Sequence, residues 1–156
     1  IGNKKTLIGC FEEYTKVEKM EREDENNDNR IFNDETKKKE NANKQITFWN
    51  FPDILVITLK RFGNNIRKNQ EYIEFPLDNL NLSKYVVGYD NKSYIYDLYG
   101  ICNHSGNVMG GHYTAFIKNA DDNWYHCNDT IIQKIGNLDT LKTPKAYCFF
   151  YRKQKK

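Results

Sequence analysis

Long apolar runs are absent from this chain of 156 residues. No stretch approaches the ~20 consecutive apolar residues that a helix needs to cross a bilayer, so we expect no membrane association. No signal peptide opens the chain, which begins at Ile1 rather than at Met. The sequence therefore predicts a piece of a longer intracellular protein, located in the cytoplasm or the nucleus.

Cysteine is sparse as well, with four residues and no CxxC pair. Wide spacing of this kind favours reduced thiols over a disulfide framework or a zinc site, so we expect no bound metal. An excess of one charge is also missing, because 24 Lys and Arg residues stand against 21 Asp and Glu residues, for a net charge of +3. That balance is too mild to predict a nucleic-acid partner.

The length suits one packed domain, and several segments carry the pattern of ordered structure. Apolar residues at spacings of three and four predict a helix over Thr6–Lys16. Residues 18–44 are mostly charged or Asn, which predicts a flexible insertion, with a charged helix in its first part as the alternative. Ile54–Phe62 predicts a strand that is buried on both faces at its apolar start and reaches the surface at its basic end.

Three further strands are expected along the second half of the chain. Glu71–Phe75 alternates like a half-buried strand, Ser93–Asn103 is rich in Tyr and Ile, and Ala146–Tyr151 closes the pattern. A short turn at Leu138–Leu141 precedes the last of them. These elements predict an α+β fold, mainly an antiparallel β-sheet with few helices.

The segments Gly110–Ala115 and Trp124–Asp129 carry the chemistry-bearing residues. The polar stretch Asn119–Asn123 separates them and predicts a hairpin centred on Asp121. That register places His112 opposite Thr130, with Asn128 as its diagonal neighbour on the same face, at a Cβ separation of roughly 7–8 Å or less. Such a pair suits a His base oriented by an amide, as in Cys-His-Asn catalysis.

Most other residues near the hairpin are assigned structural roles, whereas Asp129 is either a cap at the strand end or a catalytic assistant. Asp129 has the opposite parity to Asn128 and faces away unless a bulge turns it. Cys127 also has the opposite parity to His112, which argues against it as a nucleophile. His104, at the start of a loop, and His126, between aromatic residues, are expected to be structural. Core positions are predicted for Phe116, Trp124, Tyr125, Cys102 and Cys148.

Together these segments resemble the C-terminal half of the catalytic domain of the ubiquitin-specific proteases, a papain-like cysteine protease family (peptidase C19). Single motifs such as "LKRF" or "GGHY" are weak signals, but several of them in the family's order form a specific one. The matching segments are Phe51–Phe62, Ile73–Leu77, Tyr96–Gly106, Gly110–Ala115, Trp124–Asp129 and Ala146–Tyr151.

The resemblance implies roles for individual residues. His112 matches the family's general base, Asn128 the residue that holds its ring, and Asp129 a second polar position that assists the site in some members. Gly110 and Gly111 match the narrow channel for the Gly-Gly tail of ubiquitin, where only glycine admits so close an approach. Tyr113 is expected, with the two glycines, among the substrate-binding residues and to pack beneath the base. Residues 103–109 match a mobile loop over the bound tail.

The resemblance implies a thiol-dependent deubiquitinase that needs no cofactor and whose partners are ubiquitin, ubiquitinated proteins and the upstream half of the same catalytic domain. Two departures qualify this. The family's "GNTC" nucleophile box is absent, so we expect this chain alone to be inactive and the Cys to come from elsewhere. The CxxC pairs of the family's zinc ribbon are also missing. A catalytically inactive ubiquitin-binding or scaffolding module is the alternative function, and general peptide proteolysis fits less well.

Overall fold

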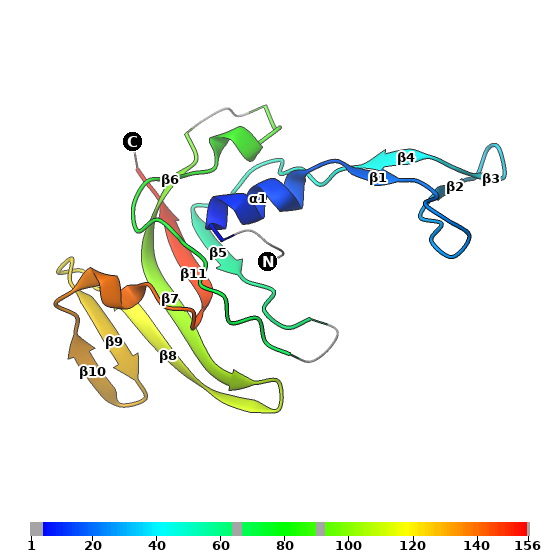
Figure 1. Ribbon diagram of the computed structural model, residues 1–156. Helices are drawn as coiled ribbons and strands as arrows, with labels where there is room; N and C mark the ends of the chain where they lie inside the picture. The colour runs from blue at the N-terminus through cyan, green and yellow to red at the C-terminus, as the bar shows by residue number, and fades with distance from the viewer. Residues whose placement is uncertain (1–4, 64–66, 90–92, 156) are drawn as a thin grey trace.

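A computed structural model describes residues 5–63, 67–89 and 93–155. Its body is a seven-stranded sheet in which consecutive neighbours follow the order β10-β9-β8-β7-β11-β5, while the short β6 pairs with β7 (Figure 1). All the pairings in this sheet are antiparallel. The strands are β5 Ile54–Thr58, β6 Leu80–Asn81, β7 Ile95–Asn107, β8 Gly110–Lys118, β9 Trp124–Asn128, β10 Ile131–Lys134 and β11 Ala146–Lys153.

The predicted helix is confirmed as α1, Leu7–Thr15. Thr6 caps it, because its hydroxyl oxygen accepts a hydrogen bond of 2.9 Å from the amide of Gly9. The turn predicted near Leu138 is a 3-10 helix over Leu138–Leu141, and a second one covers Ser83–Tyr85. No helix within the described ranges is long and apolar enough to cross a membrane.

One face of the sheet carries the hydrophobic core. Helix α1 and the connection from Ile73 to Tyr85 pack over this face, as the position of α1 in Figure 1 shows. The most deeply buried sheet residues alternate along their strands, as expected when one face is covered and the other is open. Phe149 and Tyr151 show this alternation in β11, whereas Leu98 and Ile101 of β7 are three residues apart and share the covered face because the β7–β11 register shifts between Phe150 and Tyr151.

The Ile54–Phe62 segment departs from its prediction in two ways. The strand ends at Thr58, and its faces alternate: Leu55 is buried, whereas Val56 is 51% exposed. The reason is that β5 is an edge strand with only one covered face. At the basic end, Arg61 is buried rather than at the surface, and its guanidinium donates hydrogen bonds to the carbonyl oxygens of Ala146, Asn69 and Glu71 at 2.8–3.1 Å.

No strand forms at Glu71–Phe75, although the expected alternation of burial does. Ile73 and Phe75 are buried in the core, and their neighbours are exposed. The backbone of Glu74 pairs with the start of α1 instead, in a single parallel bridge to Thr6. The segment therefore pairs with the start of α1 and does not add a strand to the sheet.

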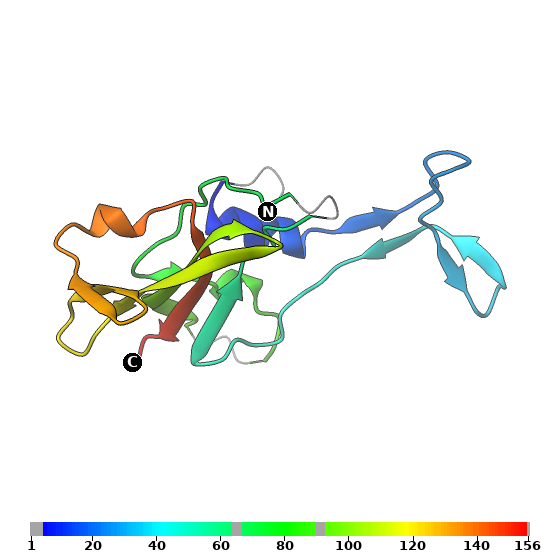
Figure 2. The same cartoon turned by 90° about the horizontal axis from the view of Figure 1, so that it is seen from below.

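Residues 18–44 form an arm with regular structure that sequence patterning missed. Four strands, β1 Glu18–Met20, β2 Ile31–Asn33, β3 Lys38–Glu40 and β4 Ala42–Lys44, pair as two antiparallel ribbons, β1 with β4 and β2 with β3. The arm projects away from the sheet in both views (Figures 1 and 2). The alternative of a charged helix is wrong, because the first part of the segment forms β1 and β2. Polar contacts between paired strands hold these ribbons together, and such contacts leave no periodic pattern in the sequence. The mobility of the arm stays a prediction.

Candidate active site

The β8–β9 hairpin has the predicted register. Ala115 pairs with Cys127 and Lys118 with Trp124, which centres the turn on Asp121. The amide of Asn119 donates to the carbonyl oxygen of Asn123 at 2.9 Å and closes the turn. Extended one residue beyond this ladder, the same register places Asn128 opposite Thr114, which makes Asn128 the diagonal neighbour of His112, as the sequence predicts.

The side chains of His112 and Asn128 meet at the end of this hairpin. His112 Nε2 lies 2.6 Å from Asn128 Oδ1. Because a carboxamide oxygen only accepts hydrogen bonds, Nε2 carries the hydrogen of this bond, and in the neutral ring the lone pair is then on Nδ1. The His112 side chain is 53% exposed, so this free nitrogen belongs to an accessible ring that is held by one neighbour. The arrangement can accept a proton from an approaching group.

The Asp129 carboxylate also lies near the His112 ring, although strand alternation predicted that it would face away. The φ of Asp129, 50°, lies in the left-handed region, at the tight turn that joins Asn128 to the first residue of β10, Ile131. A turn, not a bulge, therefore brings the carboxylate back, and Oδ2 lies 4.0 Å from His112 Nε2. That separation is too long for a hydrogen bond, so the carboxylate acts on the ring only through its charge.

The two glycines before His112 differ in their surroundings. A Cβ on Gly110 would meet nothing within 4 Å, so its surface is open to an approaching chain. A Cβ on Gly111 would lie 2.4 Å from both His104 Nε2 and the carbonyl oxygen of Ser105. Packing within the protein therefore already requires glycine at position 111, whatever passes outside.

Tyr113 does not pack beneath His112, which corrects the expectation for this residue. Adjacent residues of a strand point to opposite faces, and the Tyr113 ring contacts His104 across the strand pair, with 4.7 Å between ring centroids. The ring of Tyr113 remains 56% exposed.

The segment expected as a mobile loop over residues 103–109 is also different. Strand β7 continues to Asn107, and Val108 and Met109 alone form the turn into β8. His104, expected at the start of a loop, is therefore a strand residue with only 3% of its surface exposed. His126 lies in β9, where its ring packs against Phe116 at 5.1 Å between centroids. Phe116 and Trp124 are buried as predicted, whereas Tyr125 is half-buried and its hydroxyl donates to Asp121.

None of the four cysteines has the features of an activated nucleophile. All are free thiols, and each is partly exposed. Burial raises the pKa of Cys10 and of Cys102, which disfavours the reactive thiolate. Cys127 pairs with Ala115 and directly precedes Asn128 in β9. Because side chains alternate along a strand, its thiol points to the face opposite His112 and Asn128. In the described part of the chain, no cluster of three or more His, Cys, Asp or Glu residues could hold a metal ion.

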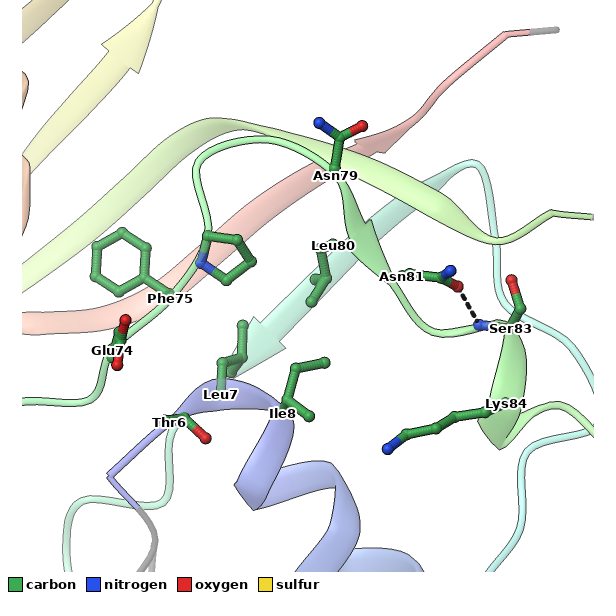
Figure 3. A pocket seen from close by; sticks show the side chains of 11 residues that line it. Thr6, Leu7, Ile8, Glu74, Phe75, Asn79, Leu80, Asn81, Ser83 and Lys84 are labelled. Carbon is green, nitrogen blue, oxygen red and sulfur yellow. Dashed lines mark hydrogen bonds between the residues drawn. The ribbon is translucent and has the colours of Figure 1, made fainter.

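A larger hollow lies elsewhere, between the start of α1 and β6. Figure 3 shows the side chains of Leu7, Ile8 and Leu80 around this cavity of about 830 Å³. Its polar groups are already engaged: the Thr6 hydroxyl caps α1, and Lys84 Nζ pairs with the carboxylate of Glu12 at 3.0 Å. The site at His112 does not border this cavity.

Comparison with known proteins gives consistent matches over nearly the whole chain. A family profile described as "Ubiquitin carboxyl-terminal hydrolase" matches residues 5–151. Ubiquitin carboxyl-terminal hydrolase 9 of Arabidopsis thaliana is 39% identical over 152 residues, which cover 95% of this chain and 16% of the relative. Ubiquitin carboxyl-terminal hydrolase 31 of Homo sapiens is 34% identical over 175 residues, covering 96% of this chain and 12% of the relative.

Solved structures give the same answer. The SAGA DUB module Ubp8(C146A)/Sgf11/Sus1/Sgf73 bound to monoubiquitin matches with a TM-score of 0.79 and 33% identity, over 99% of this chain and 34% of the other. The Ubp8 module bound to ubiquitin aldehyde matches with a TM-score of 0.77 and 31% identity, over 99% and 35%. The predicted fold class is confirmed as part of a larger domain, since this chain spans about a third of those chains and a far smaller share of the curated relatives. This chain belongs to the ubiquitin carboxyl-terminal hydrolase family of cysteine-type ubiquitin hydrolases (peptidase C19), as a segment of the catalytic domain.

Proposed function

We propose that this chain supplies the general base, and the group that orients it, to a thiol-dependent deubiquitinase whose nucleophilic Cys lies in a segment outside residues 1–156. The observation that carries the proposal is the 2.6 Å contact between His112 Nε2 and Asn128 Oδ1. It fixes the tautomer in which Nδ1 is the free base, as a Cys-His-Asn site requires. The upstream half of the same catalytic domain is then the first partner of this chain.

Each proton has a defined place in the proposed reaction. His112 Nδ1 takes the proton of the thiol, and the thiolate attacks the carbonyl carbon of the C-terminal glycine of ubiquitin. When the tetrahedral intermediate collapses, the imidazolium gives that proton to the departing lysine amine, which leaves a thioester. Water then attacks the thioester, with His112 again as base and then as acid to the thiol. This acyl transfer consumes one water molecule and needs no metal or redox cofactor.

Asn128 and Asp129 divide the support of His112 between them. Asn128 accepts the Nε2 hydrogen bond in both protonation states of the ring, so it maintains the ring's orientation through the cycle. The Asp129 carboxylate lies 4.0 Å from Nε2, so it acts on the ring only through its charge. Its side chain is 78% exposed, so we expect solvent to weaken this effect considerably.

Ubiquitin and ubiquitinated proteins are the proposed substrates. Two of the matched structures are described as bound to monoubiquitin and to ubiquitin aldehyde. In this chain, the open backbone surface at Gly110, two residues from the base, fits the approach of an extended glycine tail. Because ubiquitin conjugates are intracellular, the proposal places the protein in the cytoplasm or the nucleus.

A ubiquitin probe with an electrophile at its C-terminus tests the proposal. We expect it to label one Cys of the full-length protein, outside residues 1–156, and His112→Ala to abolish labelling without loss of ubiquitin binding. His126→Gln is the matched control, since that ring lies on the same hairpin and contacts Phe116 rather than Asn128. A full-length protein that binds ubiquitin but is never labelled supports the alternative of an inactive binding module. Labelling that survives in the His112→Ala variant removes His112 from the mechanism.

A further inference from the structure

The ribbon that carries His112 projects beyond the main sheet. Residues 110–114 of β8 pair with β7 alone, because the β8–β9 ladder begins only at Ala115. On the other side, the β7–β11 pairing reaches Asn103, with one further hydrogen bond from the His104 amide to the carbonyl oxygen of Lys145 at 2.9 Å. Residues 104–113 therefore form a two-stranded ribbon, and such ribbons are marginally stable without packing against something else.

His104 provides that packing. Its ring lies against Tyr113 of the opposite strand at 4.7 Å between centroids, Tyr147 at 5.8 Å and Phe62 at 5.9 Å. Tyr147 and Phe62 come from outside the ribbon, so the ring ties the ribbon to the rest of the molecule. A Cβ added to Gly111 would lie 2.4 Å from His104 Nε2. The ring of His104 therefore packs directly against the backbone of Gly111, the residue before His112.

The ring of His104 and the ring of His112 lie on opposite faces of the ribbon. Tyr113, which contacts His104, alternates with His112 along β8. His104 therefore supports the backbone of the base from behind, while Asn128 holds the base itself in front. No contact between the two imidazoles is needed for the first to position the second.

The surroundings of His104 accommodate only a neutral ring. Nδ1 is buried and has no hydrogen-bond partner within the described structure. The neighbouring cavity of about 180 Å³ is lined by Lys68 and Lys145 among otherwise uncharged residues, and Lys68 Nζ donates to the carbonyl oxygen of His104 itself. The other groups that face the ring are Phe62, Tyr113 and Tyr147. An added proton at Nδ1 would lack an acceptor and would lie beside an ammonium group.

We propose that His104 is a positioning residue for the base: as a neutral imidazole it anchors the ribbon of residues 104–113, and its protonation releases that ribbon and misplaces His112. The inference rests on the proposed function of His112. Burial, together with the Lys68 charge, lowers the pKa of His104 from its ordinary value of 6.5. The unfolded ribbon therefore takes up the proton first, so its stability is full above about pH 6.5 and falls as the pH drops.

Hydrogen exchange on the full-length protein gives the first test, independent of catalysis. After correction for intrinsic exchange rates, we expect protection of residues 104–113 to fall reversibly between about pH 7 and pH 5, while that of β11 is retained. In a His104→Phe variant, whose ring cannot be protonated, the ribbon keeps its protection at the lower pH. Equal loss in the variant and the wild type, or no loss in the wild type, overturns the proposal.

The rate of labelling by the ubiquitin electrophile gives the second test. We expect His104→Ala to lower the rate about 10²-fold at neutral pH, because a displacement near 1 Å in a catalytic group has effects of that size. His104→Phe should label at a rate near that of the wild type at neutral pH and lose less of it on acidification. His126→Gln, the control, should follow the wild type at every pH. Wild-type labelling by His104→Ala overturns the proposal, whereas a wild type that is not labelled at all defeats the proposed function and leaves the exchange result to judge His104.

Discussion

The covered face of the sheet is buried, whereas the ribbon at its catalytic end is largely exposed. At the covered face, Phe149 and Tyr151 are fully buried, and Ile101 is 1% exposed. In the ribbon, Gly110 and His112 are exposed and pair with a single neighbouring strand. The same antiparallel ladder, β7 with β8, runs through both regions, so backbone pairing alone does not account for the difference.

The contrast shows that stability and chemistry depend on different residues of one sheet. An apolar side chain that is buried from all sides contributes packing and carries no group that could exchange a proton. A base must reach solvent and substrate, so it keeps few contacts and adds little to stability. Changes at the two regions should therefore separate cleanly into losses of stability and losses of activity.

Removal of the base should have the largest effect. We expect His112→Ala to lower turnover of a ubiquitin ester by the full-length enzyme by at least about 10⁴-fold, as for the loss of a member of other catalytic triads. The free energy of unfolding should stay within about 0.5 kcal/mol of the wild type, because the ring is exposed. Kinetics and chemical denaturation measure the two quantities. A large loss of stability in this variant would contradict the separation between the regions.

Truncation in the core should have the reverse profile. Phe149 is fully buried and its ring packs on Phe75 with 4.6 Å between centroids. We expect Phe149→Ala to cost about 3–5 kcal/mol of unfolding free energy, through lost burial and the cavity left behind. The activity of the fraction that remains folded should be close to that of the wild type.

Phe150 is the matched control for that truncation. It is the next residue of β11, points to the open face and is only half-buried. Phe150→Ala should cost clearly less than Phe149→Ala, as measured by denaturant titration of both variants. Equal costs would mean that a segment outside this chain covers the open face in the full-length protein.

The catalytic end was the more predictable of the two regions. The register of β8 and β9 follows from a local turn between two alternating runs, so the meeting of His112 with Asn128 could be derived from parity alone. The return of Asp129 could not, because it depends on the left-handed backbone of one turn residue. The orientation of Tyr113 follows from the same strand alternation, yet the family resemblance suggested the opposite face.

The elements whose burial or structure was wrongly predicted are those that depend on contacts with residues distant in the sequence. Burial of β5 on both faces was expected from its apolar run, but the exposure of Val56 is decided by the position of β5 at the sheet edge. Arg61 is buried because carbonyl groups as distant in sequence as that of Ala146 accept its hydrogen bonds. In the arm, polar cross-strand pairs such as Lys44 with Glu18 close ribbons that a hydrophobic pattern cannot predict.

The two groups near Nε2 sharpen the comparison within the catalytic end. Asn128→Ala removes the 2.6 Å hydrogen bond and leaves the ring free to rotate, so we expect turnover to fall about 10²-fold. Asp129→Asn removes only a charge at 4.0 Å, for which we expect less than a tenfold loss, smaller still at high salt. Asn is chosen because it tolerates the left-handed backbone at this position. Steady-state kinetics at two ionic strengths distinguish the two roles, and an equal loss in both variants would show that the charge of Asp129 supports the base as much as its orientation by Asn128 does.

The two glycines before His112 locate the boundary between the two regions to one residue. Gly111→Ala places a Cβ 2.4 Å from His104 Nε2 and from a backbone carbonyl oxygen, so we expect a loss of about 1–3 kcal/mol in stability together with lower activity. Gly110→Ala meets nothing within 4 Å, so its stability should match the wild type within about 0.5 kcal/mol. If the ubiquitin tail crosses this backbone, the KM for a ubiquitin substrate should nevertheless rise in the second variant. An unchanged KM would mean that the tail passes elsewhere, and that the structure requires glycine only at position 111.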